Sequence, residues 1–237
     1  MNLLLLHPED FDTPQLARIC GRRHRHLVDV LRAEPGQSVN VGMINGLLGE
    51  AHVVSLAADH AILEVALASP PPVPAQVTLL LALPRPKVFR RILQGTTAFG
   101  IKRIVLLNTA RVDKSYWQSP FLAAQAIHEQ LLLGLEQGRD TRLPEVLLRP
   151  RFRPFVEDEL SGLSAASLCL VAHPDGARPC PCAVAGPVTL AVGPEGGFIP
   201  FEVDLLRSRG FLPVHLGTRT LRVESAVPAL LGRLLPL

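Results

Sequence analysis

The sequence lacks several features that would assign it to other classes of protein. Its 237 residues contain no apolar stretch long enough to span a bilayer, and the N-terminal run Leu3–Leu6 is too short for a signal peptide. The four cysteines show no Cys-x2-Cys spacing, so neither a zinc site nor a disulfide framework is indicated. A hydrophobic content of 48% is ample for a core. We therefore expect a cytoplasmic globular protein with no membrane anchor and no bound metal.

Lysine is also scarce, and charge is unevenly distributed. Residues 1–69 hold five Arg against eight Asp or Glu, a net charge of −3, whereas residues 70–237 hold 19 Lys or Arg against 13 Asp or Glu, a net charge of +6. Within the acidic first part, all the arginines lie within fifteen residues, beside His24 and His26. Such a cluster attracts phosphates at long range, although a solvated surface without a ligand is the alternative. Its members are Arg18, Arg22, Arg23, Arg25 and Arg32.

The first segment reads as a small β-rich module. A strand over 39–42 is followed by Asn45-Gly46, a pair typical of a type I′ hairpin turn in which both central residues have positive φ. Alternation over 51–56 and 62–67 predicts two further strands. The proline-rich stretch 70–74 can continue neither a ladder nor a helix, so it marks a boundary between domains 1–72 and 73–237.

Beyond the prolines, short apolar strands alternate with helical patterns. This alternation predicts a parallel α/β sheet with helices on both faces. No GxGxxG follows the first strand, which argues against dinucleotide binding. The expected strands cover 77–83, 104–107, 168–171, 188–192 and 214–216, and the expected helices cover 87–99, 120–136, 201–208 and 222–234.

Two of these strands stop at turns that contain glycine. The strand over 188–192 leads into Gly193-Pro194-Glu195-Gly196-Gly197, and the strand over 214–216 leads into Gly217. Open α/β sheets place their ligand crevice at the carboxyl ends of strands, where the next helix offers unpaired N–H groups. Glycine leaves room for close approach of the backbone to a ligand. An ordinary Pro-Gly turn is the alternative for this stretch alone.

The two turns together resemble a known family. The pair GPEGGF (193–198) and LGTRTLRVESA (216–226), one helix apart near the C-terminus, resembles the signature of the RsmE family of SPOUT-class methyltransferases. The chain departs from the usual form at Val223 and Ser225, where the family carries Thr, and at Pro84–Lys87, where the family is richer in glycine.

The resemblance implies a fold, a cofactor and partners. It implies a PUA-like RNA-binding barrel over 1–72 and a SPOUT domain over 73–237 with a trefoil knot and a homodimer interface. It further implies methylation of N3 of a uridine in 16S rRNA of the small ribosomal subunit with S-adenosylmethionine. The cofactor would contact Leu83, His173, Gly193, Pro194, Glu195, Gly196, Gly197, Leu216, Gly217, Arg219 and Leu221.

The candidate catalytic residues follow the second glycine-containing turn in the sequence. Methylation of N3 needs removal of an imide proton and stabilisation of charge on the flanking oxygens. Arg222 and Glu224 are the candidate catalytic residues, although Glu224 could instead favour a helix start and Arg222 could bind phosphate. RNA contacts are expected from Arg22, Arg23, Arg25 and Arg32 of the first segment and from Arg111, Lys114 and Arg142 of the second.

Two further functions fit the same residues. The chain could be a SPOUT methyltransferase for another RNA nucleotide, or a non-catalytic RNA-binding factor in ribosome assembly. The departures at Val223 and at Pro84–Lys87 keep the second of these open.

Overall fold

The computed structural model describes residues 2–174 and 178–236, which fall into two compact units. Unit 1 comprises Met1–Val73 and Leu132–Leu143, and unit 2 comprises Pro74–Leu131 and Pro144–Leu237. The sequence analysis placed residues 132–143 in the second domain, whereas their contacts group them with unit 1. The physical reason is apolar packing, because Leu135 is fully buried against Leu3 and Leu5.

Unit 1 is built on a six-stranded sheet in the order β1-β4-β5-β6-β3-β2. The apolar run at the N-terminus supplies β1, which pairs in parallel with β4, and every other pair in this sheet is antiparallel. Alternate residues of the strands point into one core that includes Ile19, Val41 and Leu63. The elements of unit 1 are β1 (Leu4–Leu6), β2 (Phe11–Thr13), β3 (Leu16–Cys20), α1 (Gly21–Arg25), a π-helical turn (His26–Val30), β4 (Ser38–Met43), β5 (Leu48–Leu56) and β6 (His60–Ser69).

The hairpin between β4 and β5 was predicted correctly, but its turn type was not. Among the described residues of the loop only Asn45 has positive φ, at 56°, so the turn is not type I′. The loop has four residues, 44–47, and the N–H of Gly46 donates to the carbonyl of Met43 at 2.8 Å. The side chain of Asn45 accepts from the N–H of Leu143 at 2.9 Å, a contact between residues 98 positions apart that no local pattern signals.

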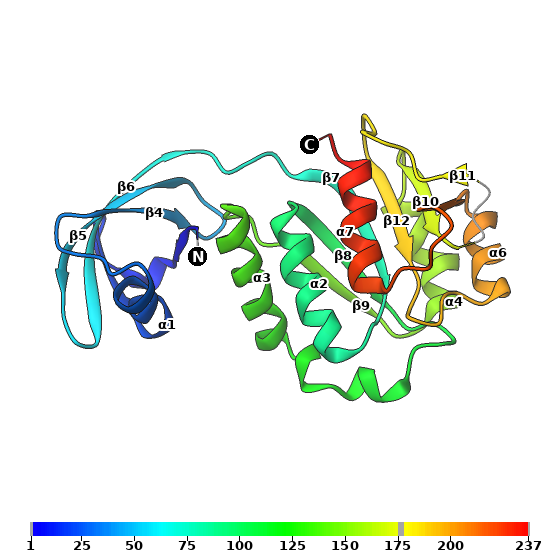
Figure 1. Cartoon of the computed structure of the whole chain (residues 1–237), viewed down its shortest axis with the longest axis horizontal. Coiled ribbons are helices and arrows are strands. Elements are labelled where there is room, and N and C mark those ends of the chain that lie inside the picture. Colours follow the sequence, from blue (N-terminus) through cyan, green and yellow to red (C-terminus); the bar gives the residue numbers. More distant parts are fainter. Residues whose placement is uncertain (1, 175–177, 237) are drawn as a thin grey trace. The chain divides into compact units, whose positions relative to one another are not determined.

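Unit 2 is a seven-stranded sheet in the order β11-β13-β10-β12-β7-β8-β9, and every pair is parallel. The predicted alternation of strands and helices is confirmed, and Figure 1 shows α2 and α7 side by side on the sheet. All residues of β12 are buried, as expected for a central parallel strand. The elements of unit 2 are β7 (Ala75–Ala82), α2 (Pro86–Ala98), β8 (Ile101–Leu107), β9 (Glu145–Arg149), α4 (Phe152–Pro154), α5 (Leu160–Leu163), β10 (Leu168–Ala172), β11 (Arg178–Pro179), β12 (Val188–Val192), α6 (Pro200–Ser208), β13 (Leu212–His215) and α7 (Val223–Leu234).

Helix boundaries follow local chemistry and differ slightly from prediction. The predicted helix over 120–136 is instead a short 3-10 turn, Pro120–Leu122, followed by α3 (Ala124–Gly138), because Ser119 caps the turn through the N–H of Phe121. Helix α3 contributes to both units. Helix α7 begins at Val223, so Arg222 is its N-cap residue, with an extended backbone at φ −67° and ψ 155°.

Candidate active site

Three neighbouring strand ends of unit 2 converge on one cavity. Strands β13, β10 and β12 lie next to one another in the parallel sheet, so the segments that follow them leave from the same edge. These segments enclose a cavity of about 230 Å³. The lining from them includes His173 after β10, Gly193–Phe198 after β12, and Leu216, Gly217, Arg219 and Leu221 after β13.

Helix α7 closes the cavity with an apolar wall. Val223, Ala226 and Leu230 line it from successive turns of the helix, and Val223 and Leu230 are buried. Spacings of three and four residues place these side chains on one face. Polar capacity comes mainly from the backbone of the loops, together with His173, Glu195, His215 and Arg219.

The three glycines of the first turn differ in backbone conformation and in the space around them. A Cβ on Gly193 would lie 3.0 Å from the backbone nitrogen of Phe198, a tight approach that would displace the turn, and Gly197 has φ 72°, a conformation that favours glycine. The N–H of Gly197 closes the turn onto the carbonyl of Pro194 at 2.7 Å. At Gly196, φ is not positive, and the nearest atom to an added Cβ is Cδ of Arg111 at 3.0 Å. From the sequence, all three glycines were expected to make room for a ligand, whereas in the structure each has different steric surroundings.

Two arginines from neighbouring loops hold this turn. The N–H of Arg85, after β7, donates to Oε1 of Glu195 at 3.1 Å, and the two side chains form an exposed ion pair at 4.0 Å. Arg111, after β8, donates from its guanidinium to the carbonyl of Gly196. The segment Pro84–Lys87 that leads into α2 therefore contacts the turn through the backbone and side chain of Arg85.

Glu202 is a buried carboxylate that the sequence analysis missed. Its side chain accepts from the N–H of Ala110 at 2.6 Å with one oxygen and from the N–H of Ile199 at 3.0 Å with the other. Glu202 thus caps α6 and also fixes the loop that carries Arg111. The capping role of Glu202 could have been predicted from the sequence, because Pro200 and Glu202 occupy the first and third positions of a helix. The bond to Ala110 spans 92 residues and leaves no local pattern.

Three predicted residues of the site lie outside this cavity. Leu83, expected at the cofactor, is 1% exposed in the core, with its N–H on the carbonyl of Leu107, and does not line the cavity. Arg222 is exposed, although Leu221 and Val223 on either side of it both line the cavity. Glu224 lines a separate groove between α2 and α7.

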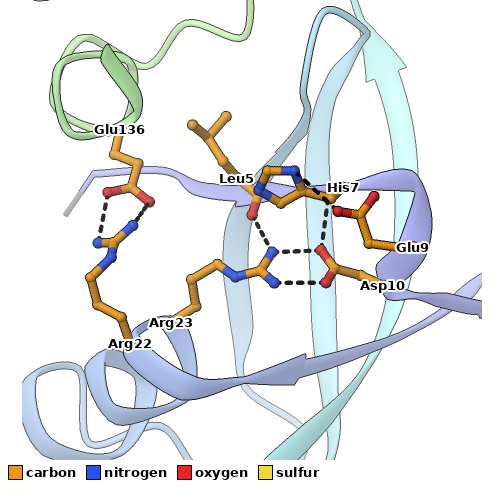
Figure 2. A network of polar contacts seen from close by, with 7 residues as sticks. All are labelled: Leu5, His7, Glu9, Asp10, Arg22, Arg23 and Glu136. Atoms are coloured by element: carbon orange, nitrogen blue, oxygen red, sulfur yellow. Dashed lines mark hydrogen bonds and ion pairs between the residues drawn. The ribbon is translucent and has the colours of Figure 1, made fainter. Parts of the chain in front are cut away.

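The predicted RNA-contacting arginines also differ in their surroundings. In unit 1, Arg22 donates twice to Glu136, at 3.0 and 2.7 Å, and Arg23 pairs with Asp10 and the carbonyl of Leu5 (Figure 2). Only 18% of the Arg23 side chain is exposed, so its guanidinium is largely committed within the unit. Arg25 and Arg32 are exposed, with no ion pair among the described residues.

The other predicted RNA contacts lie on loops. Arg111 and Lys114 are exposed on the segment after β8, and Asp113 caps the 3-10 turn that carries Lys114. The bond from Ser115 lowers the pKa of Asp113. Arg142 is exposed beyond the end of α3.

No group of three or more His, Cys, Asp or Glu residues among 2–174 and 178–236 is placed to hold a metal ion. No helix in the same ranges is both long and apolar enough to cross a membrane.

Comparison with known proteins gives consistent matches. Residues 71–235 match the model of an RNA methyltransferase domain. Ribosomal RNA small subunit methyltransferase E from Treponema pallidum is 31% identical over 213 residues, covering 87% of this chain and 80% of that protein. The protein of the same name from Synechocystis is 29% identical over 234 residues, covering 98% and 76%. The crystal structure of the Neisseria gonorrhoeae enzyme of that name, bound to S-adenosyl methionine, superposes with a TM-score of 0.73 at 21% identity, covering 98% and 95%.

Proposed function

We propose a function from one premise: the chain belongs to the RNA methyltransferase family that includes ribosomal RNA small subunit methyltransferase E. It is an S-adenosylmethionine-dependent methyltransferase whose substrate is 16S rRNA of the small ribosomal subunit, and the methylated atom is N3 of a uridine. The observation that carries this proposal is the convergence of the two glycine turns and His173 on one cavity at the carboxyl edge of a parallel sheet.

The residues of that cavity fit an adenosyl ligand. Val223, Ala226 and Leu230 offer an apolar wall for a purine ring, and the turns offer backbone N–H and C=O groups for its polar edge. The absence of side chains at Gly193 and Gly217 keeps the backbone accessible. S-adenosylmethionine, when bound, supplies an electrophilic methyl group.

The chain's own groups must position the uridine and manage its charge. Loss of the N3 proton spreads negative charge over the two flanking carbonyl oxygens, which a cation can stabilise. Arg222 suits this role, because its extended backbone turns it away from the cavity-lining neighbours Leu221 and Val223, toward solvent where RNA approaches. Glu224 lines the groove between α2 and α7 rather than the cavity, so we assign the charge-stabilising role to Arg222 and no base role to Glu224.

Unit 1 is proposed as a PUA-like barrel that binds RNA. Its exposed arginines without ion pairs, Arg25 and Arg32, are the strongest candidates for phosphate contacts, with Arg22 and Arg23 contributing charge while paired. Arg111, Lys114 and Arg142 extend the basic surface.

Unit 2 is proposed to contain a trefoil knot and to form a homodimer. The order β13-β10-β12 supports the knot, because β10 lies between two strands that follow it in the chain. The apolar residues Val227, Leu230 and Leu231 of α7 are buried within the protomer, so they offer no surface to a second copy. The dimer proposal therefore rests on the groove of about 240 Å³ between α2 and α7, which includes Ile92 and Phe99.

Three measurements test these proposals. Light scattering at micromolar concentration should give twice the mass of the chain, and the mass of one chain would refute the dimer. Calorimetry should detect S-adenosylmethionine binding, and incubation of 16S rRNA with methyl-labelled S-adenosylmethionine should yield labelled 3-methyluridine after nucleoside digestion. Label in another nucleoside would favour a different target nucleotide, and binding without transfer to rRNA or small subunits would favour a non-catalytic assembly factor.

A further inference from the structure

Another cavity, of about 230 Å³, lies in unit 1 and shares no lining residue with the candidate active site. It opens beside the start of β1, the π-helical turn and β4, with the segment after α3 as its fourth side. No Asp or Glu lines it. Its lining includes Asn2, His26, Leu31, Gln37, Asn40 and Arg139.

The walls of this cavity are tied together. Arg22 on α1 donates twice to the buried carboxylate of Glu136 on α3 (Figure 2). The N–H of Asn2 donates to the carbonyl of Glu136 at 3.1 Å, and its amide donates to the carbonyl of Gln137 at 3.1 Å. Arg139 follows directly, held at φ 53° past the helix end. The cavity is therefore a built feature of the unit rather than a gap between loose loops.

Several polar groups at this cavity have no partner within the described ranges. Asn40 and Arg139 make no side-chain hydrogen bond or ion pair there. Nε2 of His26 is buried without a hydrogen bond, and burial lowers the pKa of this residue, so the ring is neutral near pH 7. Buried polar atoms without partners are uncommon, because leaving one unsatisfied costs about 1–3 kcal/mol. Asn40 and Arg139 are exposed, so water satisfies them, and only Nε2 of His26 carries this cost. A ligand in the cavity, directly or through a water molecule, would supply the partner that His26 lacks and would replace water on Asn40 and Arg139.

We infer that this cavity binds one unpaired nucleotide of the RNA substrate. The amide of Asn40 is open to a ligand, whereas the amide of Asn2 already donates to the carbonyl of Gln137 and Oε1 of Gln37 already accepts from the N–H of Glu34 at 3.1 Å. The amide of Asn40 and the remaining donors and acceptors of Asn2 and Gln37 match the mixed pattern of a base edge. Leu31, 41% exposed, offers an apolar surface to a base face, and Arg139 offers a charge to a phosphate. The lack of a carboxylate in the lining favours an anionic ligand. This inference rests on the proposed function, since it takes RNA as the substrate.

Arg139→Gly and Asn40→Ala test the two halves of the site. Glycine accepts the positive φ at 139, so the first change removes the cation without adding strain. With a 16S rRNA transcript, each should weaken binding about three- to tenfold, the range expected for one or two lost hydrogen bonds. Only Arg139→Gly should reduce the salt dependence, by about 0.7 to 0.9 in the log–log slope. Arg207→Ala, which removes an exposed ion pair with Asp204 on α6 of unit 2, is the matched control.

A second readout locates the RNA directly. Photo-crosslinking of a 4-thiouridine-substituted 16S transcript, followed by mass spectrometry of peptides, should give adducts within 37–40 or at 139. Wild-type RNA affinity in both variants, or cavity variants no weaker than Arg207→Ala, would overturn the inference. S-adenosylmethionine affinity and methylation at saturating RNA should be unchanged in these variants. Failure of the wild-type protein to bind or methylate RNA would instead refute the proposed function.

Discussion

Glu202 and Arg111 should act on cofactor binding as one unit. Glu202 holds the backbone of Ala110, and the next residue, Arg111, donates to the carbonyl of Gly196 in the turn that lines the cavity. Replacing Glu202 by Gln keeps one oxygen, which the nearby N–H of Ile199 can retain, and presents an NH₂ group to the N–H of Ala110. The variant therefore keeps the helix cap and releases the loop.

The expected magnitude follows from the bonds that are lost. A hydrogen bond to a charged group contributes about 1.5–3 kcal/mol, and the part of it that fixes the turn appears as lost cofactor affinity. We expect Glu202→Gln and Arg111→Ala each to weaken S-adenosylmethionine binding about three- to tenfold. Because both changes free the same turn, the double variant should be little weaker than either single variant, with a coupling of about 0.5–1.5 kcal/mol.

Isothermal titration calorimetry of the four proteins measures this coupling. Thermal unfolding of each variant serves as the control for folding, because loss of the bond to Ala110 also lowers stability. Additive effects would show that Glu202 and Arg111 act independently, and unchanged affinity in Glu202→Gln would show that Glu202 only caps α6. Unchanged affinity in Arg111→Ala would refute the reasoning altogether and return Arg111 to a role in RNA contact alone.

Three further predictions concern single features of the site and the basic surface. Gly193→Ala should weaken S-adenosylmethionine binding about tenfold or more by calorimetry, because its Cβ would meet the backbone of the same turn, while Gly162→Ala, whose Cβ would meet no atom within 4 Å, should bind normally; equal affinities would contradict this. Arg222→Ala should lower single-turnover methylation about a hundredfold at saturating RNA and cofactor, and a wild-type rate would remove it from the chemistry. Replacing Arg25 and Arg32 by Ala should reduce the salt slope of RNA binding by about 1.4 to 1.8, whereas an unchanged slope would mean an unoccupied surface.

The sequence predicted the architecture of unit 2 well because that architecture is periodic. Short apolar runs such as Val188–Val192 are buried on both faces in a parallel sheet, so their composition alone identifies them. Glycine at strand ends then identified the edge where the cavity lies. The edge strand β9, by contrast, is only partly buried and was missed, since its sequence carries little of that signal.

Long-range contacts account for what the sequence could not predict. The assignment of residues 132–143 to unit 1 depends on Leu135 packing against Leu3 and Leu5. The pairing of Arg22 with Glu136 joins residues 114 positions apart, so a cluster that reads as free positive charge is partly neutralised in the fold. Spacing along the chain carries no information about such partners.

Nucleoside analysis of rRNA tests the central claim most directly. Mass spectrometry of 16S rRNA from a strain that lacks this gene should show loss of 3-methyluridine, and the wild-type gene should restore it, whereas a Gly193→Ala copy should restore it poorly. An unchanged level of 3-methyluridine in the deletion strain would contradict the account.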